Sequence, residues 1–281
     1  MKIYVNGEFL SEEDAKVSVF DYGFLYGYGL FESMRAYNGK VFRLDRHVKR
    51  LFESAKRIGM NLSVEEGEVR AAAQKTLEEN GLSDAYLRVT VTYGKGGPRL
   101  EFSQNVENSL VVFAREFSPD APAYERGIRV AISEAVKPHS KFSGVKSLNF
   151  LPYLMAKLEA KERGVDDIVL TNPDGTLAEA STSNIFFVSK GGLVTPDSGI
   201  LPGITKEAVV EIAAKEGIQV DERRVLPNEM KFFEECFLTN SVMELVPVVE
   251  IDGNAVGSGA PGEITRKIHH LYRRLVADES L

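Results

Sequence analysis

The sequence predicts an α+β fold that is divided into two domains. The chain of 281 residues is longer than a typical single domain. Strand and hairpin signals are mixed with scattered amphipathic helices rather than alternating strictly with them, which favours α+β over a parallel α/β sheet. The segment 117–127, FSPDAPAYERG, loses periodicity and gains prolines, as linkers do. We therefore expect an N-terminal α+β domain over residues 1–120 and a C-terminal α+β domain over residues 121–281.

The N-terminal domain begins with a hairpin signal. Asn6-Gly7 stands between alternating apolar residues, and this dipeptide is the strongest short turn signal between two strands. Apolar residues at helical spacing then predict two amphipathic helices, and two alternating segments predict paired strands. The expected elements are the hairpin over 3–9, helices that contain residues 46–58 and 69–77, and strands over 86–93 and 109–115.

The C-terminal domain mixes apolar strand segments with amphipathic helices. The strand segments are short and rich in Val, Ile and Phe, whereas the helical segments repeat apolar residues every three or four positions. The expected strands cover 128–136, 167–171, 184–189, 218–225 and 235–239, and the expected helices cover 148–163, 205–216 and 262–277.

Composition excludes several classes of protein. The net charge of -7 disfavours a nucleic-acid partner, which needs a basic surface. The single cysteine, Cys236, cannot form an internal disulfide and fits a reducing compartment. No apolar run reaches the ~18 residues of a membrane span, and the histidines have no zinc spacing with Cys236. We expect a cytoplasmic protein without a nucleic-acid partner, a membrane or a metal.

Two segments suggest phosphate binding. Leu201-Pro202-Gly203-Ile204-Thr205 is a turn that opens an amphipathic helix, whose first N–H groups and dipole favour a phosphate. Ordinary helix capping explains the same residues. His47, Arg50 and Ser54 lie at positions i, i+3 and i+7, on a helix face that we place opposite the apolar stripe. Arg50 on this face either binds a phosphate or is part of a solvated surface.

Two further residues suggest covalent cofactor chemistry. Lys146, in GVKSLNF, stands near the start of a helix among small and apolar residues that would desolvate its amine and lower its pKa. A surface lysine is the plain alternative. Glu179, in LAEASTSNIFF, is a carboxylate in a run of small residues before an apolar strand, and its plain alternative is an acid beside a turn. Together the four features fit one phosphate-bearing cofactor that is linked to a lysine.

Five motifs in order resemble the class IV aminotransferases, the fold type IV enzymes that use pyridoxal 5'-phosphate. They are FDYGFLYGYGLFESMRAYNGKVFRLDRHVKRLFESA, VKSLNFLPYLMAKLEAKERG, LAEASTSNIFF, LPGITKEAVV and FLTNSVMELVPVVEIDG. The resemblance covers nearly the whole chain. It implies the two-domain fold of the D-amino-acid aminotransferase type, a homodimer, and an amino acid and a 2-oxo acid as substrates.

The resemblance also implies a role for each matching residue. Lys146 carries the cofactor as a Schiff base and moves the substrate proton. Glu179 faces the pyridine nitrogen and keeps it protonated, which makes the ring an electron sink. The phosphate is held by residues that supply a guanidinium, helix-end N–H groups and side-chain oxygens. These residues are Arg50, Ile204, Thr205, Asn240 and Ser241.

The branched-chain aminotransferases are the first of three branches that the chain resembles. Their side-chain and carboxylate pockets match Tyr26, Phe31, Arg35, Tyr86 and Arg88. This branch implies transfer of an amino group from a hydrophobic, branched-chain L-amino acid to 2-oxoglutarate. Two strings differ from its usual pattern: Ser33 replaces a glycine, and Thr239-Asn240-Ser241-Val242 replaces TGTA.

Two other branches and one non-enzyme remain open. Aminodeoxychorismate lyases, which release pyruvate, resemble the FESMR string, with Ser33 as a substrate-site hydroxyl. D-amino-acid aminotransferases share VKSLN, and Pro98-Arg99 matches part of their carboxylate site, although Glu101 stands where they have histidine. A protein that binds pyridoxal phosphate without turnover is the non-enzyme alternative.

Overall fold

The chain divides into two compact units. The computed structural model describes residues 1–97, 99–102, 107–119, 121–137 and 142–280. Unit 1 consists of Met1–Ser118, Val145–Asn149 and Val276–Leu281, and unit 2 consists of Pro119–Gly144 and Phe150–Leu275. The expected boundary falls on Asp120, which lies outside the described residues. Because residues 145–149 belong to unit 1, the units are not two continuous segments. Each unit combines a sheet with helices, so the predicted α+β class is confirmed.

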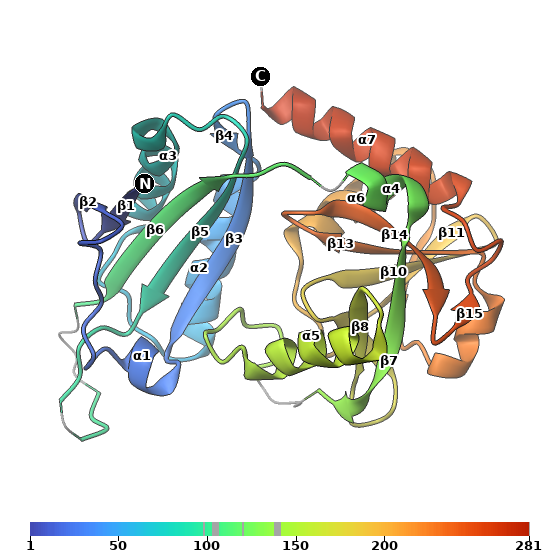
Figure 1. Cartoon of the computed structure of the whole chain (residues 1–281), viewed down its shortest axis with the longest axis horizontal. Helices are drawn as coiled ribbons and strands as arrows, with labels where there is room; N and C mark the ends of the chain where they lie inside the picture. Colours follow the sequence, from blue (N-terminus) through green and yellow to red (C-terminus); the bar gives the residue numbers. More distant parts are fainter. Residues whose placement is uncertain (98, 103–106, 120, 138–141, 281) are drawn as a thin grey trace. The chain divides into compact units, whose positions relative to one another are not determined.

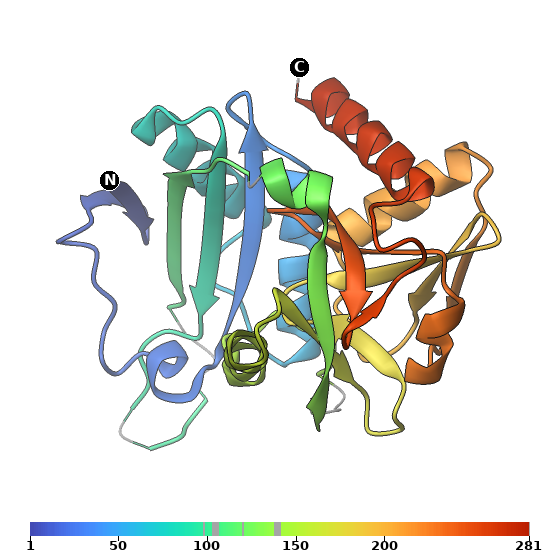
Figure 2. The ribbon, with the colours of Figure 1, turned by 45° about the vertical axis from the view of Figure 1, so that its right-hand side comes forward.

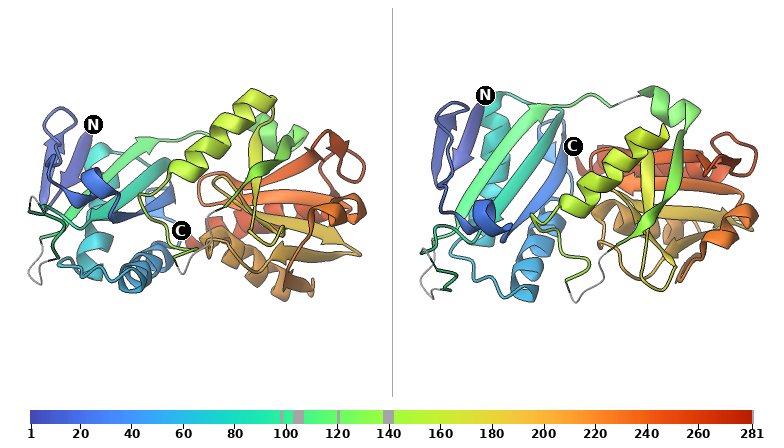
Figure 3. Two further views of the ribbon diagram at one scale, coloured as in Figure 1. Left: turned by 90° about the horizontal axis from the view of Figure 1, so that it is seen from below. Right: turned by 60° about the horizontal axis from the view of Figure 1, so that its bottom comes forward.

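Unit 1 is built on a six-stranded sheet with the order β2-β1-β6-β5-β3-β4. The predicted hairpin is confirmed, since Val5 pairs with Glu8 across a turn in which Asn6 and Gly7 have φ angles of 48° and 100°. Helices α2 and α3 pack on one face of this sheet (Figures 1 and 3). The elements are β1 (Lys2–Val5), β2 (Glu8–Ser11), α1 (Tyr22–Tyr26), β3 (Gly29–Tyr37), β4 (Lys40–Val41), α2 (Leu44–Arg57), α3 (Glu66–Asn80), β5 (Ala85–Thr92) and β6 (Ser109–Glu116).

The core of unit 1 follows the alternation of its strands. Leu87 and Val89 of β5 are fully buried, and they belong to one apolar cluster with Val48 and Leu51 of the helix layer.

The sequence did not predict β3. This strand is buried on both faces, so it lacks the alternation of apolar and polar residues that marks a half-buried strand.

Unit 2 is built on a nine-stranded mixed sheet with the order β12-β11-β10-β13-β14-β7-β8-β9, and β15 pairs with β14. Strand β7 runs parallel to both β14 and β8, as Figure 2 shows for β7 and β14. Antiparallel pairs form most of the rest. The strands are β7 (Ile128–Val136), β8 (Asp167–Thr171), β9 (Leu177–Ala180), β10 (Asn184–Ser189), β11 (Gly192–Pro196), β12 (Val220–Arg223), β13 (Glu235–Asn240), β14 (Glu244–Ile251) and β15 (Asn254–Ala255).

The predicted helices of unit 2 are present with small shifts at their ends. Helix α5 packs on β7 and β8, and α6 packs on β12 and β13. A short helix, α4, occupies part of the segment that we expected to be an aperiodic linker. No helix among the described residues is long and apolar enough to cross a membrane. The helices are α4 (Ala121–Arg126), α5 (Leu151–Arg163), α6 (Ile204–Lys215), the 3₁₀ helix η1 (Pro227–Phe232) and α7 (Glu263–Glu279).

Candidate active site

Strands β3 and β5 bring most of the predicted substrate residues onto one face of the unit 1 sheet. The antiparallel register places Ser33 opposite Arg88 and Arg35 opposite Tyr86. Directly opposed residues point to the same side of a sheet, and so do residues two apart on one strand. The residues that share this face are Phe31, Ser33, Arg35, Tyr86 and Arg88.

An aromatic ring on this face contacts two cations. The Cζ atom of Arg88 lies 3.8 Å from the centre of the Phe31 ring, and the Nζ atom of Lys146 lies 4.6 Å from the same centre. Both distances are typical of cation–π contacts. Two hydroxyl groups are next to them, because Ser33 Oγ is 3.3 Å from Tyr86 Oη. The face therefore offers an apolar surface together with positive charge, which suits a substrate that carries a carboxylate.

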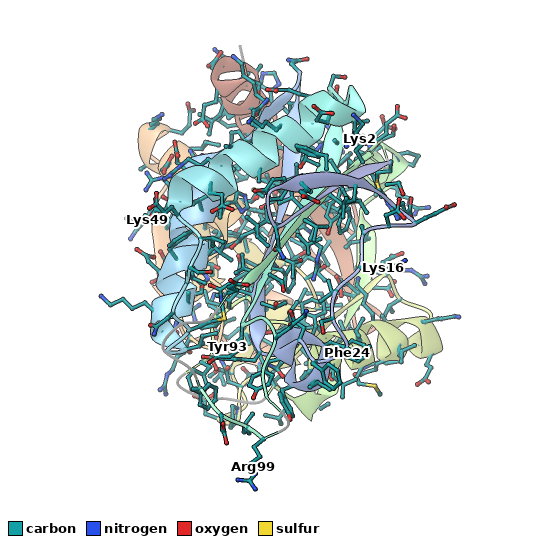
Figure 4. The ribbon with its side chains drawn as sticks, turned by 90° about the vertical axis from the view of Figure 1, so that its left-hand side faces the viewer. Lys2, Lys16, Phe24, Lys49, Tyr93 and Arg99 are labelled. Carbon is teal, nitrogen blue, oxygen red and sulfur yellow. The ribbon has the colours of Figure 1, made fainter. Side chains whose placement is uncertain are left out.

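Two residues that the sequence assigned to substrate binding lie elsewhere in unit 1. Tyr26 is on α1, where its half-exposed ring packs edge-on against Tyr22 at 5.1 Å. Arg99, proposed for a D-amino-acid carboxylate site, points away from the protein in Figure 4. Its neighbour Pro98 lies outside the described residues. Unit 1 alone thus places neither Tyr26 nor Arg99 against Phe31.

Lys146 belongs to an extended segment that adds to the edge of β3. Phe31 N donates to Lys146 O at 3.0 Å, and Leu148 N donates to Gly29 O at 3.0 Å. An isolated antiparallel bridge joins Leu30 and Ser147 between these bonds. We expected Lys146 near the start of a helix, but α5 begins only at Leu151. Backbone hydrogen bonds therefore fix the lysine on β3.

Arg50 is held by a buried carboxylate on the opposite face of β3. Arg50 Nε donates to Glu32 Oε1 at 2.8 Å, and Arg50 Nη2 donates to Glu32 Oε2 at 2.5 Å. His47 Nδ1 lies 2.7 Å from Glu32 Oε2. A bidentate pair of this kind fixes the direction of the guanidinium. Sequence reasoning missed Glu32, whose only signal is a lone acid among apolar residues in LFESM.

The charges in this cluster stabilise one another. Burial alone would raise the pKa of Glu32, but Arg50 and His47 outweigh it and lower this pKa to about 2. Burial lowers the pKa of His47, so a neutral His47 donates from Nδ1 to the ionised Glu32. The alternative of a solvated helix face is therefore wrong. His47, Arg50 and Ser54 are all buried, whereas Lys49 on the same helix points into solvent (Figure 4).

Glu179 is buried in β9 of unit 2, with 4% of its surface exposed. Its Oε2 atom accepts hydrogen bonds from Leu201 N at 2.8 Å and Asn184 Nδ2 at 3.4 Å. Its Oε1 atom accepts a short hydrogen bond from Lys137 Nζ and lies 3.5 Å from Tyr153 Oη. Glu179 is thus an acid close to the turn between β9 and β10, as the plain alternative held, but it is buried and hydrogen-bonded. Sequence reasoning missed Lys137, which nothing in AVKPHSKF distinguishes from a surface lysine.

The turn before α6 presents uncapped backbone N–H groups. Helix α6 begins at Ile204, and its N-cap Gly203 has no side chain that could accept from the first turn. Ile204 and Thr205 are buried at this terminus. A Cβ atom on Gly203 would lie 2.0 Å from Asn184 Oδ1, so glycine is required for this close approach. The predicted turn and helix start are present, and they leave donors that suit an anion.

Asn240 and Ser241 lie where β13 ends and the chain turns into β14. Asn240 Oδ1 accepts from Val242 N at 2.9 Å and from Met243 N at 2.7 Å. Asn240 Nδ2 donates to Ser183 Oγ at 2.9 Å. The oxygen of Asn240 therefore shapes the turn that follows β13, and Ser241 stands in this turn.

The two units each contain chemistry that fits pyridoxal 5'-phosphate. Unit 1 supplies an amine, Lys146, and a fixed guanidinium, Arg50. Unit 2 supplies a buried carboxylate, Glu179, and a helix terminus whose N-cap provides no acceptor. An amine for a carbonyl, a carboxylate for a ring nitrogen, and cationic and N–H donors for a phosphate match the functional groups of this cofactor. The donor set therefore fits.

Comparison with known proteins identifies the family. The family model described as amino-transferase class IV matches residues 29–251. This chain is a class IV aminotransferase. The matched range contains Arg50, Lys146 and Glu179. Class IV aminotransferases use pyridoxal phosphate, so the expected enzyme class and cofactor are confirmed, and the alternative of a protein without turnover is set aside.

The similar proteins include some named as branched-chain-amino-acid aminotransferases and others named as D-alanine aminotransferases. A protein of Methanocaldococcus jannaschii whose name assigns it provisionally to the branched-chain-amino-acid aminotransferases is 39% identical over 97% of this chain and 96% of its own. A D-alanine aminotransferase of Listeria monocytogenes is 32% identical over 97% of this chain and 95% of its own.

A solved structure confirms the predicted fold type. The branched-chain aminotransferase of Thermoproteus uzoniensis, determined with norvaline, superposes with a TM-score of 0.92 and 34% identity. The superposition covers 99% of this chain and 95% of that chain. The class IV aminotransferase described here therefore shares the fold type IV architecture.

Proposed function

We propose that this class IV aminotransferase exchanges an amino group between a hydrophobic, branched-chain L-amino acid and 2-oxoglutarate. The observation that carries the proposal is the β3–β5 face, where the Phe31 ring contacts both Arg88 and Lys146. An amino acid with an apolar side chain needs both an apolar wall and a cation for its carboxylate. The names of the M. jannaschii relative and of the T. uzoniensis structure support the same substrate class.

Each of the proposed residues would have its own role toward one bound cofactor. Pyridoxal phosphate supplies, when bound, an electron sink for the bond that breaks at the substrate Cα atom. The amine of Lys146 would hold the cofactor through its carbonyl group and, as the base of the site, would move the proton at the substrate Cα atom. Glu179 holds a proton at the ring nitrogen. Arg50 and the N–H groups of Ile204 and Thr205 bind the phosphate.

On the substrate side, Arg88 and Tyr86 would bind the carboxylate, and Phe31 would contact the apolar side chain. Arg35 is less accessible than Arg88, because it is buried and stacks on Tyr37 with 4.4 Å between Cζ and the ring centre. We therefore assign Arg35 to holding the shape of this face. Tyr26 and Ser33 complete the proposed substrate set.

We also propose that the enzyme is a homodimer. Large apolar side chains are exposed on the segment that contains α1 and, separately, on α5. Contiguous apolar patches of this kind are typical of protein interfaces. Sedimentation velocity should show a single species of twice the chain mass at micromolar concentration, and a monomer there would contradict the proposal. The exposed residues are Val17, Val19, Phe20, Phe24, Leu25, Leu151, Leu154, Met155 and Leu158.

The cytoplasmic location expected from the sequence stays a prediction.

Transfer from a D-amino acid is the second candidate, because the Listeria relative is a D-alanine aminotransferase. The test is the absorbance of the cofactor-loaded protein after separate additions of L-leucine, D-alanine and aminodeoxychorismate. Loss of the cofactor band with L-leucine alone, and glutamate formation when 2-oxoglutarate follows, would support the first proposal. Loss of the cofactor band with D-alanine, or pyruvate release from aminodeoxychorismate, would replace the first proposal with the corresponding activity.

A matched pair of lysine variants controls this experiment. Lys146→Ala should remove the band of the lysine-bound cofactor and lower turnover by about 10⁴-fold or more. Lys49→Ala, which removes an exposed lysine from α2, should leave both unchanged. Retained turnover in Lys146→Ala would show that another residue carries the cofactor.

A further inference from the structure

Glu179 has a buried cationic partner that the proposed function does not use. Lys137 follows β7, and only 5% of its surface is exposed. Its ammonium group donates a short hydrogen bond to Glu179 Oε1 and another to Gly199 O at 2.5 Å. Burying a lysine is costly unless a carboxylate neutralises it. Lys137 therefore has one well-defined position, and that position is set by Glu179.

The neighbours of the pair complete its electrostatic environment. Tyr153 of α5 lies over the ammonium, with 5.3 Å between Nζ and the ring centre. Burial alone would lower the pKa of Lys137, but Glu179 and Tyr153 outweigh it and raise this pKa. Burial is the largest cause that raises the pKa of Tyr153, and the charge of Glu179 raises this pKa further. Among the described residues that contact Glu179, Lys137 and Tyr153 are the two titratable groups, and at neutral pH they are a cation and a neutral phenol.

We infer that Lys137 is a positioning residue that holds the Glu179 carboxylate in place and weakens its attraction for the proton of the cofactor's ring nitrogen. A carboxylate that is already paired with an ammonium group attracts a further positive charge less than an unpaired carboxylate does. Lys137 would thus set how strongly the ring is protonated, and with it the strength of the electron sink. This inference rests on the proposed role of Glu179.

The experiment measures ring protonation rather than turnover. Wild type, Lys137→Met and Lys137→Arg are loaded with pyridoxal phosphate that is ¹⁵N-labelled in the ring, and the ¹⁵N shift is followed from about pH 5.5 to about pH 10, a range chosen to span the ring's titration. Removal of the positive charge in Lys137→Met should raise the midpoint pH of ring deprotonation by about one unit or more. Lys137→Arg keeps the charge and should retain the wild-type midpoint.

Two controls separate this role from general effects on the fold. Lys157→Met removes a lysine that pairs with Asp167 in the same unit at 2.9 Å, and it should leave the ¹⁵N shifts unchanged. Lys137→Gln, which keeps a hydrogen-bond donor but not the charge, replaces Lys137→Met if that variant does not fold.

Two results would overturn the inference. One is a ¹⁵N signal that is identical in wild type and the neutral Lys137 variant at every pH. The other is a Lys137→Arg variant that behaves like Lys137→Met. Either result leaves the proposed function intact if L-leucine still converts the cofactor. A wild type that fails to transaminate would instead contradict the proposed function.

Discussion

The two units bury one carboxylate each, and they hold it in different ways. Glu32 in unit 1 is bound on both oxygens by a bidentate arginine and also by a histidine. Glu179 in unit 2 is bound by one lysine, one backbone N–H and a longer bond from an amide. A carboxylate accepts about four hydrogen bonds. The Glu32 cluster therefore works as a rigid anchor for Arg50, whereas two contacts of Glu179, with Asn184 Nδ2 at 3.4 Å and Tyr153 Oη at 3.5 Å, are long enough for a ligand to replace.

The comparison predicts that Glu179→Gln damages catalysis far more than Glu32→Gln does. An amide cannot hold a proton at the ring nitrogen, so kcat should fall on the order of 10³-fold, the range of general acid–base effects. The dissociation constant of pyridoxal phosphate should change much less. Steady-state kinetics with L-leucine, at saturating cofactor, measures the first quantity.

The matched variant for this prediction is Glu32→Gln, whose kcat at saturating cofactor should stay within about tenfold of wild type. If Glu179→Gln also stays within that range, the assignment of distinct roles to the two carboxylates is wrong.

The second prediction concerns the free energy of unfolding rather than catalysis. Glu32→Gln leaves the Arg50 guanidinium buried without a counter-charge, and breaking such a pair lowers the free energy of unfolding by about 3 kcal/mol or more. Urea denaturation at neutral pH measures this change. The control is Glu79→Gln, which removes the exposed partner of the exposed Lys2 and should cost less than about 1 kcal/mol.

The third prediction follows from the pKa of Glu32, which is lowered from 4.5 to about 2. A group whose pKa is lowered on folding stabilises the protein above its unfolded pKa and loses that contribution as the pH falls toward its folded pKa. The contribution of Glu32 is roughly 3 kcal/mol, and it should be lost between about pH 5 and about pH 2. The stability difference between wild type and Glu32→Gln should therefore shrink over this range. A difference that stays constant with pH would show that Glu32 is not ionised in the fold.

Local patterns were sufficient to predict much of the fold. Asn6-Gly7 predicted the hairpin, and the apolar runs predicted β7, β8 and β10 with the bounds that the structure shows. Strand β3, which the sequence did not predict, shows what local patterns lack. On β3 the inward position of Glu32 interrupts the apolar series of Leu30 and Met34, and only the charges of Arg50 and His47, which are distant in sequence, make that position favourable.

The candidate site was less predictable from residue patterns than from resemblance. The motifs identified Lys146 and Glu179, and their positions remain consistent with the proposed roles. Spacing along α2 left Arg50 either on a solvated face or against a phosphate, because helical periodicity contains no information about a carboxylate on another element. Lys137 was missed for the same reason, since a buried lysine can be recognised only from the partner that neutralises it.

The smallest expected effect concerns Ser33, which stands where the branched-chain enzymes that the chain resembles usually have glycine. Its hydroxyl group lies 3.3 Å from Tyr86 Oη at a partly buried position, and a hydrogen bond of this kind contributes about 1 kcal/mol. Ser33→Ala should therefore change kcat/KM for L-leucine by less than about fivefold. Thr90→Val, which removes the acceptor of Arg88 Nε on the same face, is the matched control.

The comparison of two substrates makes this last variant informative. If Ser33 only positions Tyr86, Ser33→Ala and Ser33→Gly should alter L-leucine and D-alanine turnover in the same proportion. If Ser33 Oγ contacts the substrate, the ratio of the two kcat/KM values should change by about tenfold or more, because an unpaired hydroxyl partner discriminates between ligands. A changed ratio would move Ser33 from the support of the β3–β5 face to the residues that choose the amino donor.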